Sequence, residues 1–261
     1  MGESGVEKSD KYRAPALDKG LDILELLANS AGGLNQAEIA KALDRTTNEN
    51  YRMLDTLVRR GYVTRTPEGD RYMLSLKLLV LANQHPPRRR VLDIAEPLMR
   101  ALCLEAEQSA QLAQWQDGDI VIVSSYSAPG NWRQSLRTGS IIGLYNTGSG
   151  RVLAAFQSSD QQLQMIRGHQ LVKGEVALEE AAFIADLAKL RAKGCAVEAS
   201  GTVRGTTNIS FPILDPSGSA IAALTCPYIE RIDNYPAPDL KDVTEIMRKA
   251  AAEIGRQIAG A

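Results

Sequence analysis

The sequence is poor in the side chains that most often build catalytic and metal sites. It has two histidines and three cysteines in 261 residues, and Cys103, Cys195 and Cys226 lie far apart. An odd number of widely spaced cysteines argues against a disulfide framework and fits a reducing cytoplasm. His85 and His169 stand in no metal-ligand spacing, so we expect no metal site.

Long apolar runs and a strong charge of either sign are also missing. No stretch of 18 apolar residues and no signal-peptide core is present, which predicts a protein that neither enters a membrane nor is exported. The net charge is −1. Residues 1–90 carry 15 Lys and Arg against 12 Asp and Glu, a net of +3, whereas the remainder has a net of −4. This split agrees with a nucleic-acid-facing N-terminal part.

The chain is nevertheless able to build packed cores, because 44% of its residues are hydrophobic and 23% are charged. Its length suggests two domains. We expect a polar mobile arm at 1–14, a first domain at 15–77, a linker at 78–95 and a second domain at 96–261.

The most informative stretch is 34–61, which predicts two short helices joined by a tight connection. Asn35 is a good N-cap with Glu38 three residues later. Thr46 and Glu49 form a T-x-x-E capping box that begins the second helix. An apolar face on that helix follows from 3.6-residue spacing of Tyr51, Leu54, Leu57 and Val58. The opposite, free face carries Asn48, Glu49, Arg52, Thr56 and Arg59.

This pair of helices has the shape that places one helix in a DNA major groove, although an ordinary helical hairpin is the alternative. The neighbouring segments favour DNA binding. An amphipathic helix over 17–28 comes first, and after Gly61 the apolar period changes from 3.6 to 2. Strands are expected at 62–66 and 71–74. Three helices and a hairpin form a winged helix-turn-helix, in which Arg65 and Arg71 can straddle a phosphate backbone rather than remain solvated.

A linker should follow this domain. Residues 74–82 are apolar enough for a helix, and the pair Pro86-Pro87 should stop any helix and stiffen the joint. The arginines at 88–90 can rest on DNA, on an acidic partner or in solvent. A helix is expected at 91–107, with Pro97 causing a kink or marking a start near 95–96.

The remaining sequence predicts an α+β domain in which helices cover an antiparallel sheet. Strands are expected at 110–115, 120–125, 134–137, 195–197, 208–214 and 220–227. Helices are expected at 151–156, 160–166, 178–191 and 239–259.

No catalytic constellation or cofactor motif is visible. The loop Gly148-Ser149-Gly150 lacks the ending of a P-loop and is not a nucleophile elbow, so it is either a carboxylate-binding helix N-terminus or a plain turn. His169 is interpreted as a surface loop residue. Glu198 either hydrogen-bonds a ligand or is an exposed loop acid. An enzyme is therefore the weaker reading, since it needs a nucleophile–base pair or a metal set.

The order of these parts resembles the IclR family of bacterial transcriptional regulators over roughly 15–258. The N-terminal motifs are LDKGLDILELLA, LNQAEIAKAL, NYRMLDTLVRRGYV and RYMLS. The C-terminal motifs are AEPLMRAL, YNTGSGRVLAAF, RAKGCAVE and NISFPILDPSGSAIAAL. The resemblance implies a winged helix-turn-helix, a linker helix and a GAF-like effector domain. It also implies dimers that pair into tetramers, bind pseudo-palindromic operators and repress or activate catabolic or resistance operons.

The resemblance further implies an effector pocket at Gly148, Ser149, Glu198, Asn208 and Thr225. This sequence has Asn208 where the family commonly has cysteine, and Gly143-Leu144-Tyr145 where it usually has Pro-Leu-His. Trp132 and Tyr145 can stack on a ring. We therefore expect the effector to be a small organic carboxylic acid, an aromatic acid or an acyl derivative.

The expected mechanism is an effector-biased equilibrium of a DNA-binding repressor, with the linker around 86–90 as the lever. Candidate base-edge or adjacent phosphate contacts are Arg45, Thr47, Asn48, Glu49 and Arg52. Arg52 suits guanine, Asn48 suits adenine, and Glu49 suits cytosine if the capping box leaves it free. Candidate phosphate contacts are Arg13, Lys19, Arg65 and Arg71. A protein-interaction module with an accessory winged helix is a further alternative.

Overall fold

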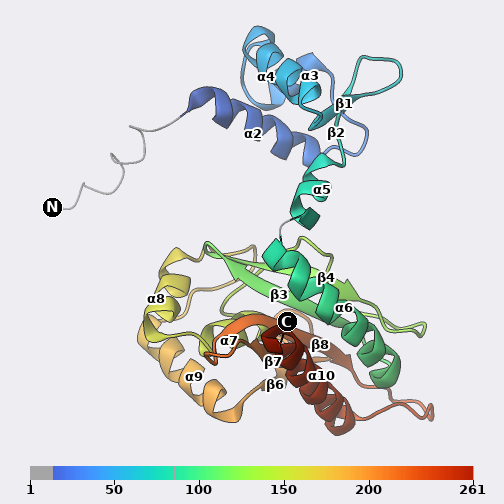
Figure 1. Cartoon of the computed structure of the whole chain (residues 1–261), viewed down its shortest axis with the longest axis vertical. Helices are drawn as coiled ribbons and strands as arrows, with labels where there is room; N and C mark the ends of the chain where they lie inside the picture. Colours follow the sequence, from blue (N-terminus) through green and yellow to red (C-terminus); the bar gives the residue numbers. More distant parts are fainter. Residues whose placement is uncertain (1–13, 85, 261) are drawn as a thin grey trace, which may run out of the picture. The chain divides into compact units, whose positions relative to one another are not determined.

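The computed structural model describes residues 14–84 and 86–260. The predictions made for the arm before residue 14, for Arg13 and for His85 lie outside this part. The described chain divides into two compact units, with the division between Pro86 and Pro87 (Figure 1). Each unit is described by itself.

The N-terminal unit has the predicted order of helices and hairpin. Its elements are α2 (Pro15–Ala28), α3 (Gln36–Ala42), α4 (Thr47–Arg59), β1 (Val63–Arg65), β2 (Tyr72–Leu74) and α5 (Lys77–Gln84). The predicted N-cap at Asn35 and the predicted capping box from Thr46 to Glu49 are confirmed, and Asn35 forms a capping box with Glu38 as well. The helix after the hairpin begins at Lys77 rather than at residue 74, because β2 still pairs with β1 through Leu74.

A small apolar core holds this unit together. It consists of Ile23, Leu27, Ile39, Leu54, Val63 and Tyr72. The prediction that Tyr51 packs into this core is wrong, because Tyr51 is 50% exposed. Asn50, one residue earlier in the helix, is buried in its place, and neither atom of its side-chain amide has a partner among the described residues.

The predicted linker at 78–95 needs correction, because it holds two helices: α5 continues to Gln84, and α6 (Pro86–Ala106) begins at Pro86 rather than at residue 91. The Pro-Pro pair begins this helix, at positions where the missing N–H groups would have no intrahelical acceptor. Pro97 lies inside α6 and does not mark its start. Arg90 donates a 2.8 Å hydrogen bond to the carbonyl oxygen of Ile258, so this arginine is held by its own unit.

The C-terminal unit is built on a six-stranded antiparallel sheet in the order β5-β4-β3-β8-β7-β6. The strands are β3 (Ala110–Gln116), β4 (Asp119–Tyr126), β5 (Ile141–Ile142), β6 (Ala196–Ala199), β7 (Thr206–Leu214) and β8 (Ala220–Ile229). The other helices are α7 (Gly148–Ala155), α8 (Ser159–Gly168), α9 (Glu180–Lys193) and α10 (Leu240–Gly260). The strand predicted at 134–137 is wrong: this segment is irregular, and the edge strand is the short β5.

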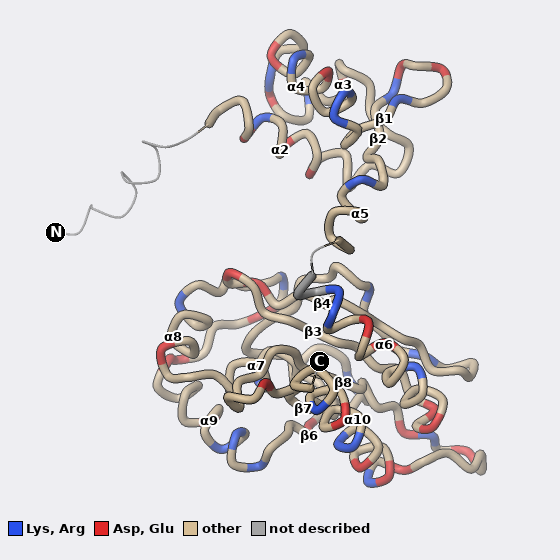
Figure 2. Tube along the Cα trace, viewed as in Figure 1, with Lys and Arg blue, Asp and Glu red and all other residues tan. Residues whose placement is uncertain are grey.

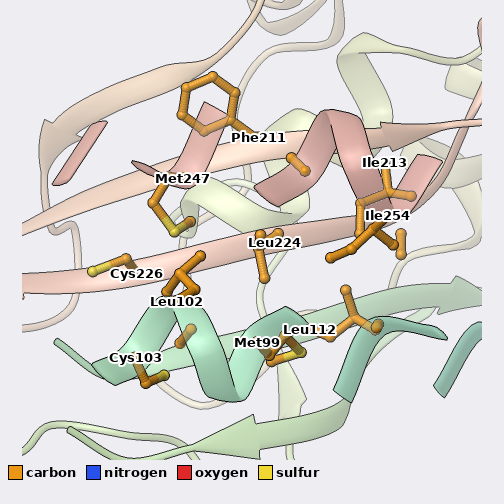
Figure 3. Close-up of a cluster of buried hydrophobic side chains, with 14 of the residues drawn as sticks. Met99, Leu102, Cys103, Leu112, Phe211, Ile213, Leu224, Cys226, Met247 and Ile254 are labelled. Atoms are coloured by element: carbon orange, nitrogen blue, oxygen red, sulfur yellow. The ribbon is translucent and has the colours of Figure 1, made fainter. Parts of the chain in front are cut away.

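Helices cover both faces of this sheet. One face packs against α6 and α10, and Figure 3 shows residues such as Met99, Leu224 and Met247 meeting there. The other face packs against α7, α8 and α9, with Phe183 buried in this second core. Side chains of adjacent strand positions alternate between the two cores, as the two-residue period of a strand requires. No helix among the described residues has both the length and the apolar character needed to cross a membrane.

Candidate DNA-binding and effector sites

The free face of α4 is the candidate DNA-reading surface. Its capped N-terminus presents Thr47 and Asn48, and one turn later Arg52, all of them exposed. Tyr51 lies beside them and is half exposed, which sequence reasoning missed because its spacing to Leu54 also fits a packing face. The arrangement offers a hydroxyl, an amide, a phenol and a guanidinium to one groove.

Glu49 belongs to the same turn but is already occupied. Its carboxylate accepts hydrogen bonds from the N–H and hydroxyl of Thr46 at 3.0 and 2.9 Å, and Lys19 Nζ lies 3.0 Å away. The bond from the Thr46 N–H, followed by those from Lys19 and the Thr46 hydroxyl, lowers the pKa of Glu49 from 4.5 to about 2. The condition that we set for a cytosine contact, a free Glu49, is therefore not met, and Lys19 is paired as well.

Two other candidate DNA contacts hold the unit together internally. Arg45 pairs with Asp22 of α2 at 2.5 Å. Arg71 donates to the carbonyl oxygens of Gly32 and Gly33 at 3.1 and 2.9 Å and to Glu38 at 2.9 Å, so it fixes the turn that leads into α3. A phosphate contact by Arg71 would have to break these bonds.

Arg65 is the better placed of the two hairpin arginines. It is exposed, and its guanidinium lies 5.1 Å from the centre of the Tyr72 ring. The loop between the two strands also carries Glu68 and Asp70, so two negative charges lie between Arg65 and Arg71 (Figure 2). Negative charge at the tip disfavours a phosphate there, which leaves the base of the hairpin for backbone contacts.

The candidate effector site is a row of polar side chains on the sheet face that α7 covers. Gln111 of β3 pairs in register with Thr225 of β8, and Thr225 pairs with Ser210 of β7. Ser149, in the first turn of α7, lies 2.8 Å from the Thr225 hydroxyl, which donates to the Ser210 hydroxyl over 2.8 Å. All four residues are buried. These bonds satisfy hydroxyl groups that would otherwise be costly to bury.

A cavity of about 70 Å³ lies beside this row. Four of the seven expected effector contacts line it: Gly148, Ser149, Asn208 and Thr225. Sequence reasoning missed the other lining residues, which are Gln111, Gln134, Ser135, Leu136, Ile142, Thr147, Ser200, Thr202, Val203 and Pro227. Gln111 could have been predicted, because it is a polar residue inside an apolar strand. No sequence feature marked the loop residues as part of the cavity. None of the described residues that line this cavity is charged.

The N-terminus of α7 gives the cavity its polarity. Thr147 caps the helix, and its hydroxyl accepts a 3.0 Å hydrogen bond from the N–H of Gly150. The N–H groups of Gly148 and Ser149 have no intrahelical acceptor, and the helix dipole adds positive potential there. Gly148 approaches β7 so closely that a Cβ atom would lie 2.4 Å from the Ser210 hydroxyl oxygen. Any larger residue here would have to displace the Ser210 hydroxyl or move the helix away from β7.

The three remaining effector candidates lie elsewhere. Glu198 is in β6 and forms a 2.5 Å ion pair with Arg151, which also pairs with Asp186 of α9, so Glu198 is neither a cavity residue nor a free loop acid. Trp132 is 74% exposed in an irregular loop. Tyr145 packs edge-on against Phe183, with 4.8 Å between ring centres.

His169 is not the surface residue that we predicted. Its side chain is 1% exposed, and Nε2 lies 2.8 Å from the buried carboxylate of Glu175. Glu175 also accepts hydrogen bonds from the N–H groups of Tyr145 and Val172, at 2.7 and 3.1 Å. Burial alone would raise the pKa of Glu175, but these bonds and the one to His169 outweigh it and hold the pKa below 4.5. The pair therefore fixes the loop that leads into α7.

A capped, exposed recognition helix and a separate sheet domain with a polar cavity define a DNA-binding regulator with a sensor domain. Sequence comparison agrees with that class. The IclR helix-turn-helix profile matches residues 16–67, and the profile described as bacterial transcriptional regulator IclR C-terminal matches residues 87–256. The chain belongs to the IclR family of bacterial transcriptional regulators, whose C-terminal domain binds a small-molecule effector.

Among its relatives is the glycerol operon regulatory protein of Streptomyces griseus, 28% identical over 93% of this chain and 96% of that protein. The transcriptional repressor AllR of Escherichia coli K12 is 24% identical over 81% of this chain and 79% of its own. In fold, the chain is similar to an IclR homologue from Microbacterium hydrocarbonoxydans complexed with 4-hydroxybenzoate. The TM-score is 0.77 and the identity 19%, with 94% and 100% of the two chains covered. Thermotoga maritima IclR gives a TM-score of 0.73 at 21% identity, covering 94% and 99%.

Proposed function

We propose that this regulator is an operator-binding repressor whose α4 reads the major groove through Thr47, Asn48, Tyr51 and Arg52. The observation that carries this proposal is the exposed face of α4, on which these side chains stand together and free of the internal pairs that hold Arg45 and Arg71. A repressor is supported by relatives with that description, AllR among them.

The test is fluorescence anisotropy with the protein's own upstream promoter fragment and with scrambled DNA, over a series of salt concentrations. We expect binding to the promoter to be orders of magnitude tighter and to weaken steeply with salt. Arg52→Ala should weaken operator binding by about 1–3 kcal/mol and relax one position of specificity. An equal loss on scrambled DNA would make Arg52 a phosphate contact, and equal weak binding of both DNAs by the unaltered protein would contradict the proposal.

We also propose a homodimer formed through the exposed apolar side of α5. This helix has no buried residue: its Leu79 and Val80 are 58% and 49% exposed, and Leu76, which directly precedes it, is 75% exposed. In the same unit, Leu17 of α2 is 62% exposed. A second copy is the expected occupant because a pseudo-palindromic operator needs two reading helices related by a two-fold axis. Pairing into tetramers remains an extension of this proposal.

The dimer proposal is tested by light scattering on two variants. Leu79→Lys should produce monomers and lose operator affinity, because a buried unpaired cation opposes the interface. Leu104→Lys is the matched control, since Leu104 is 62% exposed on α6 in the other unit. A dimer that survives Leu79→Lys would rule out this face.

For the effector we propose a small aliphatic hydroxy acid in the cavity at Ser149. The carboxylate would accept from the N–H groups of Gly148 and Ser149, and the hydroxyl would bond to Asn208. The volume of about 70 Å³ is far below the roughly 300 Å³ at which sites for drug-sized molecules begin. This volume favours an acid of a few carbons over an aromatic one, and neither Trp132 nor Tyr145 lines the cavity.

Calorimetry with glycolate, lactate and 4-hydroxybenzoate tests this choice, with release of the promoter as a second readout. We expect the aliphatic acids to bind and Gly148→Ala to abolish their binding, because the added Cβ would displace the start of α7 from Ser210. Gly260→Ala is the control, since nothing lies within 4 Å of its added Cβ. Binding of 4-hydroxybenzoate alone would refute the size argument.

A further inference from the structure

The C-terminal unit has a further cavity without an assigned role, of about 350 Å³. This volume lies in the range of sites for small organic molecules, about 300–1,000 Å³. The cavity forms where the end of α6, the irregular loop after β4 and the segment after β8 meet. Its apolar lining comes from Trp132, Ile229 and Ile232. Trp132 is 74% exposed and Ile232 fully exposed, so an indole face is open to a ligand.

The charged lining of this cavity is mainly negative. Glu107, Glu230 and Asp233 face a single cation, Arg231. Arg231 is already engaged, because its Nε donates to Asp233 over 2.9 Å and its guanidinium lies 4.1 Å from the centre of the Tyr235 ring. Glu107 accepts a 3.5 Å hydrogen bond from the Tyr235 hydroxyl, but among the described residues of this lining no cation forms an ion pair with Glu107 or Glu230.

Glu107 stands at a position that helix geometry disfavours for it. It directly follows α6, with φ of 50°, in the left-handed conformation that glycine usually supplies at a helix end. A carboxylate is also unfavourable at the negative end of a helix dipole. The side chain thus costs stability at the helix end while adding negative charge to the cavity. Among the described residues, no three His, Cys, Asp or Glu side chains are grouped to hold a metal ion.

From this cavity we infer a second ligand site that binds an organic ammonium ion with an apolar or aromatic body. The ammonium group lies between Glu107 and Glu230, and the body lies on Trp132 and Ile232. An indole face attracts cations as well as apolar groups. The loop that carries Trp132 also contributes Gln134 and Leu136 to the cavity at Ser149, so the two cavities share one loop.

The indole of Trp132 provides a direct readout. The chain has two tryptophans, so Trp115→Phe leaves Trp132 as the only one. The N–H of Trp115 is buried without an acceptor among the described residues, so the phenyl ring removes an unsatisfied donor. In this full-length background, Trp132 fluorescence is titrated with 2-phenylethylammonium and, separately, with 3-phenylpropionate. The two probes have similar bodies and opposite charges. We expect a saturable change with the ammonium and at least about tenfold weaker binding of the carboxylate.

Three variants of this background locate the site. Glu107→Gln should weaken 2-phenylethylammonium binding by about fivefold or more, as expected for a lost charge–charge contact near a surface. Glu107→Gly should weaken it equally while melting at the same or a higher temperature, because glycine accepts the backbone geometry. Glu105→Gln, which removes one exposed charge two residues earlier in α6, should change binding by less than about twofold.

The proposal is overturned if Trp132 shows no saturable response, if both probes bind equally, or if Glu105→Gln and Glu107→Gln have equal effects. None of these results depends on the effector at Ser149, so failure here leaves the proposed function standing.

Discussion

The two units place their polar functional groups in opposite ways. The N-terminal unit has a core of six buried apolar residues and presents its candidate contacts on the outer face of one helix. The C-terminal unit packs apolar side chains on both faces of a sheet and buries its polar row between the sheet and α7. A site on one helix depends on local spacing alone, whereas the buried row requires three strands and a helix to meet in register.

The largest expected effect is the loss of stability when a core leucine is truncated, because the N-terminal unit has the smaller of the cores. Leu54 is fully buried in the small core of the N-terminal unit. Leu54→Ala should cost about 2–5 kcal/mol, which is comparable with the total stability of so small a domain. Calorimetric melting should show loss of the N-terminal transition, and operator binding should disappear while effector binding persists. Leu224→Ala is the matched control and should lower only the C-terminal transition. A single transition lowered by both substitutions would show that the units do not unfold separately.

The second largest effect is expected from Glu175, a buried carboxylate of the C-terminal unit. Glu175→Gln should reduce the stability of this unit by about 1.5–3 kcal/mol, because charge-assisted hydrogen bonds to Tyr145, Val172 and His169 are weakened. This loss of stability is measured by chemical unfolding, monitored at the transition of the C-terminal unit. Effector affinity should fall too, since the loop into α7 loses its anchor. Unchanged effector affinity would mean that this loop does not position the helix.

The same carboxylate fixes the sign of an acid dependence. The pKa of Glu175 lies below 4.5 in the folded protein, so on acidification the unfolded chain takes up the proton first. The contribution of Glu175 to stability is present above about pH 4.5 and is lost as the pH falls through the folded pKa. The melting temperature of the C-terminal unit should therefore decline less steeply on acidification in Glu175→Gln. If the melting temperatures of the unaltered protein and of Glu175→Gln fell in parallel on acidification, the lowered pKa of Glu175 would be contradicted.

Two asparagines of α4 make a smaller and more specific test. The amide of Asn50 is buried without a partner among the described residues, whereas Asn48 is exposed. Asn50→Ala should stabilise the N-terminal unit by about 1 kcal/mol, because it removes an unsatisfied amide from the core. Asn48→Ala should leave stability within about 0.5 kcal/mol and weaken operator binding. Thermal melting and anisotropy of both variants measure this, and destabilisation by Asn50→Ala would indicate an unseen partner.

The difference between the units also explains which predictions succeeded. The order of helices and strands in the N-terminal unit, the caps at Asn35 and Thr46 and the long C-terminal helix followed from local spacing. Asn50 and Tyr51 were misjudged because adjacent positions at the edge of an amphipathic face differ little in spacing. His169 was placed on the surface because its partner Glu175 lies in an irregular segment without periodicity. The effector cavity was found only where family motifs marked it, at Gly148, Ser149, Asn208 and Thr225, since its other residues come from separate loops.

The smallest expected effect comes from Glu49, where the two roles considered for one side chain predict different results. As a capping residue it is bound to Thr46 and Lys19 and reads no base. Glu49→Gln should therefore leave the sequence preference of operator binding unchanged and slightly tighten binding to all DNA, because one negative charge near the phosphates is removed. Anisotropy with a set of singly substituted operators measures this preference, and Lys19→Gln, which should weaken binding to all DNA, is the opposite-charge control. A changed preference at one base pair would show that Glu49 leaves its cap when DNA binds, and the exposed face of α4 would then include one more reading side chain.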